Sequence, residues 1–426
     1  MMDSDDQCGS LLLALLPDGC LLDVFRLLEA EDLARCQRVC WRFHSLCCVE
    51  ALWRPLAAAR WPCAAARSPP CAHGARAWFG ARAVAGVRWN AARPLRVLPL
   101  TGHQHTVFGV CAHPLRPNIV LSAGEDGLVR TWDCTTGALL AATDARLGGC
   151  FNVHAWSDQG CGFVAAAGFS GDISLMSLGT DGAPASATRV VLAAHAAPVV
   201  SVRARGDLLA SCSFDGSVRL WRVSDAVAQK DKQRLHTTPL SVLSDVPATP
   251  EAVQHPHEFS VAAVCLPPGS ESRLARGGND GLLKVWDLTS QKVVQALAGH
   301  TGWIWCLESC GDAGGNVLLS GATDSTVRCW DLRVPGSSVV TLREAGPVAG
   351  LAVRPQVGEQ RFATGSFDGS VRLFDLRMRP VLAPHQMLEV PLVGHQDRVT
   401  RVAATDAFVV SASFDTTLRV WRFDDL

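Results

Sequence analysis

The chain has 426 residues, of which 48% are hydrophobic, and its formal net charge at pH 7 is −1. This length exceeds one ordinary domain of about 150 residues, so we expect a repeat, a barrel or several domains. The near-zero charge argues against broad electrostatic attraction to nucleic acid or to an anionic membrane. The 17 cysteines include no CxxC pair, and the apolar run "LLLALL" at residues 11–16 is too short to span a bilayer. We therefore expect a soluble protein of a reducing compartment, cytoplasmic, nuclear or both.

After a tail at residues 1–15, residues 16–59 predict a small helical module. Leu21, Leu22, Phe25 and Leu28 fall at helical spacings after a Pro-Asp start. The stretch "AEDLARCQRVCWRFHSL" (30–46) continues helically with its apolar residues along one side. A module of this size has little core of its own and is expected to dock against a partner.

This module resembles the F-box family in its Leu-Pro start, its "DL" and "VC" pairs and its terminal "LW". Gly19 and Cys20 depart from the Glu and Ile that the family often has there, so the first helix is expected to begin slightly late. The resemblance implies that apolar residues of the module contact the adaptor Skp1: Leu16, Pro17, Leu21, Leu22, Phe25, Leu28, Val39, Leu52 and Trp53.

Four side chains of the second helical stretch form a pattern that resembles a metal site. Cys36, Cys40, His44 and Cys47 share one face of the predicted helix. A single straight helix cannot wrap four ligands tetrahedrally around one ion, so we favour core packing and expect neither a metal nor a cofactor.

Residues 60–93 predict a helical linker rich in Ala and Arg. The run from residue 60 to 96 holds seven arginines and no acidic residue. Nucleic-acid binding is one interpretation of such a run. We favour a spacer anchored by Trp78, Phe79 and Trp89.

From residue 94 onward the sequence repeats. A turn, an alternating strand and a terminal Trp-Asp or similar pair recur in six copies: "GEDGLVRTWD" (124–133), "SFDGSVRLWR" (213–222), "GNDGLLKVWD" (278–287), "ATDSTVRCWD" (322–331), "SFDGSVRLFD" (366–375) and "SFDTTLRVWR" (413–422). A degenerate copy, "GFSGDISLMS", occupies residues 168–177, and successive turn positions are 44, 45, 65, 44, 44 and 47 residues apart. A period near 44 built of short strands is typical of propeller blades.

The copies resemble the WD40 repeat family, which implies a mainly β fold with a seven-bladed propeller over residues 94–426. The long step contains a polar insertion at about 224–256, read as a strand plus a surface loop. Thr238 and Thr249 precede prolines there and are candidate phosphorylation sites, with an inert insertion as the alternative. The last copy ends without a fourth strand, and "PLRVLPL" (94–100) is expected to supply it and close the ring.

Four copies contain a complete set of His, Ser, Asp and Trp in register, which resembles a hydrolase triad. Because a catalytic set would occur once, we interpret the sets as the structural tetrads that the WD40 resemblance implies, each with an Asp that pins its turn. They are His103, Ser122, Asp126, Trp132; His195, Ser211, Asp215, Trp221; His300, Ser320, Asp324, Trp330; and His395, Ser411, Asp415, Trp421. No catalytic residue is predicted, and the copies without a complete set are expected to be held mainly by packing.

An F-box followed by WD40 repeats resembles the F-box/WD repeat family, the substrate receptors of SCF ubiquitin ligases. The resemblance implies a non-enzyme whose F-box docks Skp1, which links it to cullin-1 and the RING subunit, and whose propeller binds an unknown protein substrate. A non-degradative WD40 scaffold or a Skp1-bound adaptor is the alternative. No phosphate loop, nucleophile elbow or unshared acid–base pair supports an enzyme.

The resemblance also places the substrate face at fixed positions of each copy. The candidates are Phe108, Glu125, Phe214, Trp303, Trp305, Phe367, Arg398 and Phe414. In the second copy, aligned on Val153, the same positions are Asn152, His154 and Phe169. Receptors of phosphorylated segments in this family place several arginines here, whereas this set holds only Arg398. We therefore expect an apolar or unmodified peptide segment anchored by aromatics, with mere packing of the aromatics around the channel as the alternative.

Overall fold

The computed structural model describes residues 94–179, 181–228, 239–244, 260–269, 272–310, 316–334, 338–354, 361–376, 391–405 and 407–423. The predicted tail, F-box and linker, the Cys36–Cys47 pattern, Thr238 and Thr249 lie outside these residues. None of the described helices is long and apolar enough to cross a membrane.

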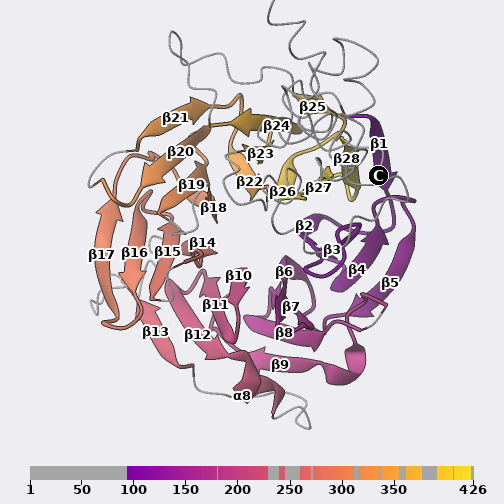
Figure 1. Ribbon diagram of the computed structural model, residues 1–426, viewed down its shortest axis with the longest axis horizontal. Helices are drawn as coiled ribbons and strands as arrows, with labels where there is room; N and C mark the ends of the chain where they lie inside the picture. Colours follow the sequence, from indigo (N-terminus) through magenta and orange to yellow (C-terminus); the bar gives the residue numbers. More distant parts are fainter. Residues whose placement is uncertain are drawn as a thin grey trace, which may run out of the picture. The chain divides into compact units, whose positions relative to one another are not determined.

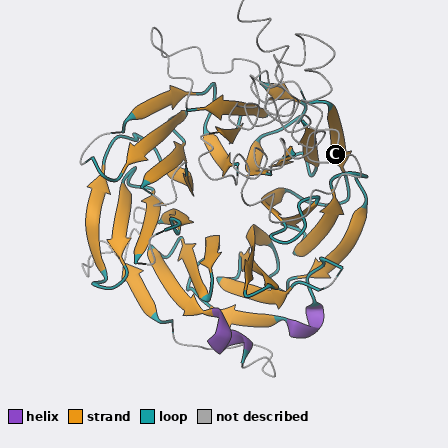
Figure 2. Ribbon diagram, in the orientation of Figure 1, coloured by secondary structure: helices purple, strands orange, loops and turns teal. Residues whose placement is uncertain are grey.

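The described residues form seven four-stranded antiparallel sheets, which are the blades of a propeller (Figure 1). Each innermost strand contacts the innermost strand of the next blade, and the last contacts the first. Figure 2 shows that strands make up nearly all of the ring. The prediction of a mainly β, seven-bladed propeller is confirmed.

The blades follow the chain in order, each running from its innermost to its outermost strand. Blade one contains β2 (Val107–Ala112), β3 (Ile119–Gly124), β4 (Leu128–Asp133) and β5 (Leu139–Asp144). Blade two contains β6 (Cys150–Asp158), β7 (Cys161–Gly168), β8 (Asp172–Ser177) and β9 (Val190–Ala193), with the short helix η1 (Ser186–Thr188) before β9. Blade three contains β10 (Val199–Arg205), β11 (Leu208–Ser213), β12 (Ser217–Arg222) and β13 (Ser241–Ser244).

The remaining blades repeat this order. Blade four contains β14 (Val261–Cys265), β15 (Arg273–Gly278), β16 (Leu283–Asp287) and β17 (Lys292–Leu297). Blade five contains β18 (Ile304–Ser309), β19 (Val317–Ala322), β20 (Thr326–Asp331) and β21 (Val340–Arg343). Blade six contains β22 (Val348–Val353), β23 (Arg361–Ser366), β24 (Ser370–Asp375) and β25 (Leu392–Val393). Blade seven contains β26 (Val399–Ala404), β27 (Phe408–Ser413), β28 (Leu418–Arg422) and β1 (Arg96–Leu100).

The ring closes through β1, as the sequence predicts. This strand pairs antiparallel with β28, from Arg96 opposite Arg422 to Leu100 opposite Leu418. The buried Leu100 packs in a cluster that joins blade seven to blade one. The strand β28 therefore has a partner on each side, β27 and β1.

The insertion in blade three begins with a helical turn, α8 (Val223–Val227), which follows β12 directly. The outermost strand β13 then pairs with β12 from within the inserted segment, with Ser217 opposite Ser244 and Leu220 opposite Ser241. The insertion thus separates the third and fourth strands of one blade and leaves the sheet intact.

The repeated turn between the second and third strands requires a left-handed residue after the Asp. Gly127 and Gly216 take φ values of 74° and 79° there, which glycine adopts without steric cost. Blades five and seven place Ser325 and Thr416 at the same position with φ values of 60° and 65°. The turn geometry therefore persists where the glycine is lost.

Candidate functional site

Each innermost strand contains a β-bulge directly after a fully buried apolar residue that anchors it. The pairing shifts by one residue after the anchors Val107, Cys150, Val199, Val261, Ile304, Val348 and Val399. A bulge re-aims the side chain of its extra residue. The extra residues are Phe108, Phe151, Val200, Ala262, Trp305, Ala349 and Thr400.

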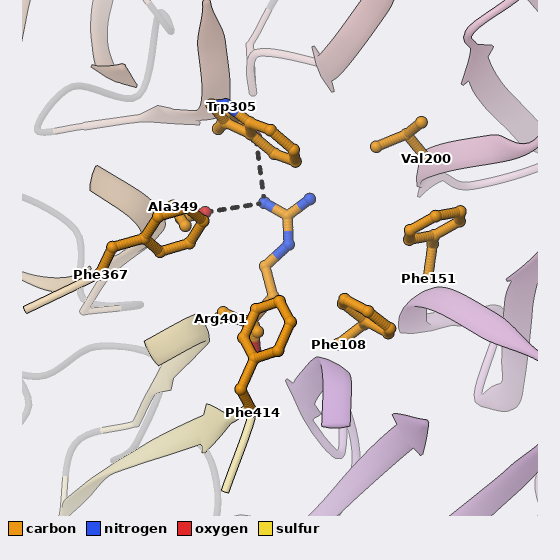
Figure 3. A pocket seen from close by; sticks show the side chains of 9 residues that line it. Phe108, Phe151, Val200, Trp305, Ala349, Phe367, Arg401 and Phe414 are labelled. Carbon is orange, nitrogen blue, oxygen red and sulfur yellow. Dashed lines mark hydrogen bonds between the residues drawn. The ribbon is translucent and has the colours of Figure 1, made fainter. Parts of the chain in front are cut away.

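Six of these seven bulge residues line one apolar cavity of about 90 Å³ at the mouth of the central channel; the exception is Ala262. Phe367, Phe414 and Arg401 complete its lining (Figure 3). Figure 3 shows the side chains arranged in a ring, with the guanidinium of Arg401 at its centre. The bulges of six blades therefore build one concave site from distant parts of the sequence.

The phenylalanines around this cavity form a continuous aromatic belt. The ring centroid of Phe108 lies 5.2 Å from that of Phe151 and 5.6 Å from that of Phe414. Phe169 approaches Phe151 to 4.1 Å, and Phe367 lies 6.3 Å from Phe414. Edge-to-face pairs of this kind are favourable beyond the area that they bury. The belt is thus both a packed layer and an aromatic surface.

Most of the predicted substrate residues meet at this mouth. Phe108, Trp305, Phe367 and Phe414 line the cavity itself. The ring centroid of Phe214 is 6.1 Å from that of Phe151, so Phe214 extends the belt into blade three.

Three further candidates lie outside the cavity lining. Trp303 is 45% exposed and stacks on Trp305 with a centroid distance of 6.3 Å. The guanidinium of Arg398 lies 5.3 Å from the ring centroid of Phe367 and 5.9 Å from that of Phe414. Glu125 is exposed. They form the rim.

Two of the three predicted positions in blade two, Asn152 and His154, are wrong, whereas the third, Phe169, contacts Phe108 and Phe151 in the aromatic belt. The register pairs Cys150 with Gly168, so Cys150 is the anchor and Phe151 the bulge residue. Asn152 is buried, and His154 lines a different cavity deeper in the channel. Sequence reasoning missed Phe151 because it took Val153 as the anchor.

The sequence analysis also missed Arg401. This residue directly follows the bulge residue Thr400 and lines the same cavity. Strict alternation along β26 places neighbouring side chains on opposite faces, so it excludes Arg401 from the face of Thr400. The bulge removes that restriction.

The structure brings the members of each tetrad together. In blade one, His103 Nδ1 lies 2.8 Å from Asp126 Oδ2, and His103 Nε2 lies 2.7 Å from Ser122 Oγ. Trp132 Nε1 donates to Ser122 Oγ at 2.8 Å. Blades three, five and seven repeat this chain with His–Asp distances of 2.8–2.9 Å and His–Ser distances of 2.7–2.8 Å.

These tetrads are structural on two grounds. The four serines are completely buried, so no substrate reaches their hydroxyls. Burial alone would raise the pKa of Asp215, but hydrogen bonds from His195 and Ser217 outweigh it and hold that pKa well below its usual range. Burial lowers the pKa of His195, and Asp215 offsets this only partly. A neutral His that bonds an ionised Asp fixes the turn and the strand.

A second cavity of about 270 Å³ lies deeper in the channel and contains Cys111, Cys265 and His154. Burial raises the pKa of both thiols to about 12 and lowers the pKa of His154 to about 3. Arg203 pairs there with Glu308 at 2.5 Å. Protonated thiols and a neutral imidazole are poor nucleophiles and acids at neutral pH, and no group of three or more His, Cys, Asp or Glu residues in the described ranges is placed to hold a metal ion.

Two family models match this chain. The F-box-like model matches residues 13–58. The WD domain, G-beta repeat model matches residues 93–133, 187–222, 291–331 and 387–422, which end with the four tetrad-containing copies. The chain therefore combines an F-box-like segment with a WD40 propeller, the F-box/WD repeat architecture. Members of both families are typically non-catalytic adaptors that bind other proteins.

Several curated proteins are similar to parts of this chain. Human F-box/WD repeat-containing protein 9 is 30% identical over 175 residues, which cover 38% of this chain and 35% of the relative. Nuclear distribution protein PAC1 of Arthroderma otae is 28% identical over 239 residues, 51% of this chain and 47% of the relative. The guanine nucleotide-binding protein subunit beta of Oryza sativa subsp. japonica is 33% identical over 127 residues, 28% of this chain and 33% of the relative. The chain thus spans half or less of the length of these relatives.

Proposed function

We propose that this protein is the substrate-recognition subunit of an SCF-type (Skp1–cullin-1–F-box) E3 ubiquitin ligase. The observation that carries the proposal is the joining, in one chain, of an F-box-like segment with a closed propeller whose channel mouth presents an aromatic belt. Similarity to F-box/WD repeat-containing protein 9 supports it. The protein is non-catalytic in this proposal.

The proposed mechanism is positioning. The F-box docks Skp1 and, through it, cullin-1 and the RING subunit, while the propeller holds a client so that its lysines face the ubiquitin-charged enzyme. Holding two reactants in a productive geometry replaces a bimolecular encounter with an effectively unimolecular step. The cytoplasm, the nucleus or both are the proposed location.

A non-degradative scaffold is the second candidate. The nuclear distribution proteins and the guanine nucleotide-binding protein subunit beta, which are named for roles other than ubiquitin transfer, support it by their similarity to this chain. In this case the propeller binds partners whose abundance does not depend on cullin activity.

Co-purification of the full chain with Skp1 and cullin-1 tests the proposal. The double substitution Leu16→Ala with Pro17→Ala is expected to abolish Skp1 recovery, whereas Trp303→Ala, at the propeller mouth, is expected to leave it intact. Proteins bound by the propeller are expected to accumulate when neddylation is blocked. Unchanged Skp1 recovery by the double variant contradicts the F-box assignment, and clients that do not accumulate favour the scaffold.

A further inference from the structure

Arg401 is the only charged residue in its layer of the channel. The layer contains the residue after each bulge, and its other members are Gly109, Asn152, Ser201, Ala263, Cys306 and Gly350. These side chains are small or uncharged. The long side chain of Arg401 therefore extends to the channel axis, where Figure 3 shows its guanidinium in the middle of the ring.

The guanidinium of Arg401 has no carboxylate partner among the residues that the structure describes. Its Nη1 donates to the backbone carbonyls of Trp305 at 3.3 Å and Ala349 at 3.5 Å, both long bonds. The carboxylate of Glu308, which lies deeper in the channel, is engaged by Arg203. A guanidinium has five N–H donors, and only Nη1 of Arg401 has hydrogen-bond acceptors in the described part of the chain. The side chain lines the apolar cavity directly.

The entrance to this cavity also carries positive charge. Arg398 is exposed at the rim and lies over the rings of Phe367 and Phe414. A ligand that enters the cavity therefore passes Arg398 at the rim and the rings of Phe367 and Phe414 before it reaches Arg401. An occupant that matches this arrangement is apolar along its side and negatively charged at its tip.

We propose that the channel mouth binds the C-terminal end of a client protein, with its terminal carboxylate on Arg401 and an apolar last side chain against the aromatic belt. This deepens the proposed function, on which it rests, by naming the chemistry of the client. A bidentate pair between a guanidinium and a carboxylate is strong and geometrically specific.

The shape of the cavity favours a chain end over an internal segment. An internal segment would have to enter the mouth and leave it again, so two stretches of its backbone would lie side by side there. Adjacent extended chains need a spacing of about 4.8 Å. The cavity of about 90 Å³ lies at the axis and is surrounded by Phe108, Phe151, Trp305, Phe367 and Phe414. One chain end with one side chain fits this space, and it carries its negative charge at the tip, where Arg401 lies.

Fluorescence polarisation on the full chain purified with Skp1 tests the proposal. The probes are fluorescein-labelled decapeptides of one Gly/Ser-rich sequence that ends in Leu, Phe, Ala or Asp, each as the free acid and as the C-terminal amide. A charge-assisted hydrogen bond contributes about 1.5–3 kcal/mol, so we expect the Leu and Phe acids to bind at least about tenfold more tightly than their amides. The Asp-ended acid is expected to bind more weakly than the Leu-ended acid.

Two arginine variants locate the carboxylate. Arg401→Met keeps the side-chain stem and is expected to abolish the difference between acid and amide, with a melting temperature at or above that of the wild type because a buried charge without a counter-ion is removed. Arg401→Lys is expected to retain part of the difference. Arg398→Met, the rim control, is expected to weaken the acids slightly more than the amides, because its charge is exposed and screened, and to preserve most of the difference.

Equal binding of acids and amides overturns the proposal, as does an acid preference that survives Arg401→Met. Tight binding of an amidated peptide with an internal Asp or phosphoserine assigns the site to an internal acidic motif and also overturns it. Skp1 and cullin-1 recovery is measured on the same preparation. Intact recovery without carboxylate-dependent binding therefore rejects this inference and leaves the proposed function standing.

Discussion

The carboxylate of Glu344 accepts a hydrogen bond of 2.7 Å from the hydroxyl of Thr364. These residues occupy the His and Ser positions of blade six: the backbone N–H of Glu344 donates to Ser325 O, as that of His195 donates to Gly171 O in blade three. The Glu344 side chain is 0% exposed and forms an ion pair with Arg372. Blade six therefore replaces the neutral imidazole chain with a buried ion pair.

Arg372→Met is expected to be strongly destabilising at neutral pH. Breaking a buried pair leaves an uncompensated charge and costs about 3–5 kcal/mol. Burial raises the pKa of Glu344 even with Thr364 and Arg372 bonded to it, and removing Arg372 raises it further. A raised carboxyl pKa means that stability is present at low pH and lost as pH rises, so the deficit of the variant is expected to be larger at pH 8 than at pH 5.

Urea unfolding of the wild type and the variant at both pH values measures this. The double variant Glu344→Met with Arg372→Met is the control and is expected to recover most of the lost stability. A deficit that is the same at pH 5 and pH 8 would show that Glu344 does not carry the effect.

Substitution by alanine is expected to affect stability differently at two buried serines, Ser320 inside a tetrad and Ser174 outside one. Ser320 Oγ accepts from Trp330 Nε1 at 2.8 Å and bonds His300 Nε2 at 2.7 Å, so Ser320→Ala leaves two buried groups unsatisfied. Each such group costs about 1–3 kcal/mol, and we expect a loss of about 2–5 kcal/mol. Ser174 Oγ is buried without a partner among the described residues, so Ser174→Ala is expected to be neutral or stabilising. Thermal and urea unfolding of both variants measures the difference, and similar losses would contradict the tetrad interpretation.

Acid is expected to weaken the propeller. Burial lowers the pKa of His195, His300 and His395 below the usual 6.5. As pH falls below 6.5, the same histidines take up protons in the unfolded chain before they do so in the folded protein, so the free energy of unfolding decreases. The pKa values of Asp215 and Asp415 are also lowered, which extends the loss below their usual 3.8. Each unit by which a pKa is lowered corresponds to about 1.4 kcal/mol.

The urea midpoint of the wild type is therefore expected to fall between pH 7.5 and pH 5 and to fall further at pH 4. The raised pKa of Glu344 makes its own contribution to stability larger at low pH. The lowered pKa values of three histidines and two aspartates outweigh this single contribution. A midpoint that stays constant or rises on acidification would contradict this account.

Closure of the ring depends on residues about 320 positions apart in the sequence. Leu100 is 1% exposed, whereas Val97 on the same strand is 38% exposed. We expect Leu100→Ala to cost about 2–5 kcal/mol because it leaves a cavity between blades seven and one, and Val97→Ala to change stability by about 0.5 kcal/mol or less. Equal effects in urea unfolding would indicate that β1 does not close the ring in solution.

The propeller was predictable because its signals are redundant. Seven turns, five of whose six spacings are 44–47 residues, define the blades, and the segment "PLRVLPL" before the first copy provides a strand for blade seven. The tetrads were predictable for a similar reason, since four residue types recur together in register. Blade two departs from this pattern by being apolar, with Ala166 and Met176 at the Ser and Trp positions.

Two residues of the cavity, Phe151 and Arg401, were not predictable from strand alternation or from the spacing of the repeats. Anchors precede their turn positions by 16–20 residues in the other blades, and both Cys150, at 20, and Val153, at 17, satisfy that range. Arg401 was hidden for a geometric reason: a bulge lets Thr400 and Arg401, adjacent in sequence, line the same cavity. A bulge is set by pairing between strands, which a single sequence does not display.

Trp303→Ala distinguishes a binding role of the rim from simple packing. Because Trp303 is 45% exposed and its ring stacks on that of Trp305, its removal is expected to cost about 1 kcal/mol of stability or less. An aromatic anchor of an interface contributes about 2 kcal/mol or more, so binding of a client is expected to weaken at least about thirtyfold. Val294→Ala, on the outer strand β17 and 54% exposed, is the matched control and is expected to change neither property. Surface plasmon resonance with any client recovered by the wild type, together with thermal unfolding, decides the matter: unchanged affinity, or a stability loss that accounts for the weaker binding, would assign the aromatic rim to packing around the channel.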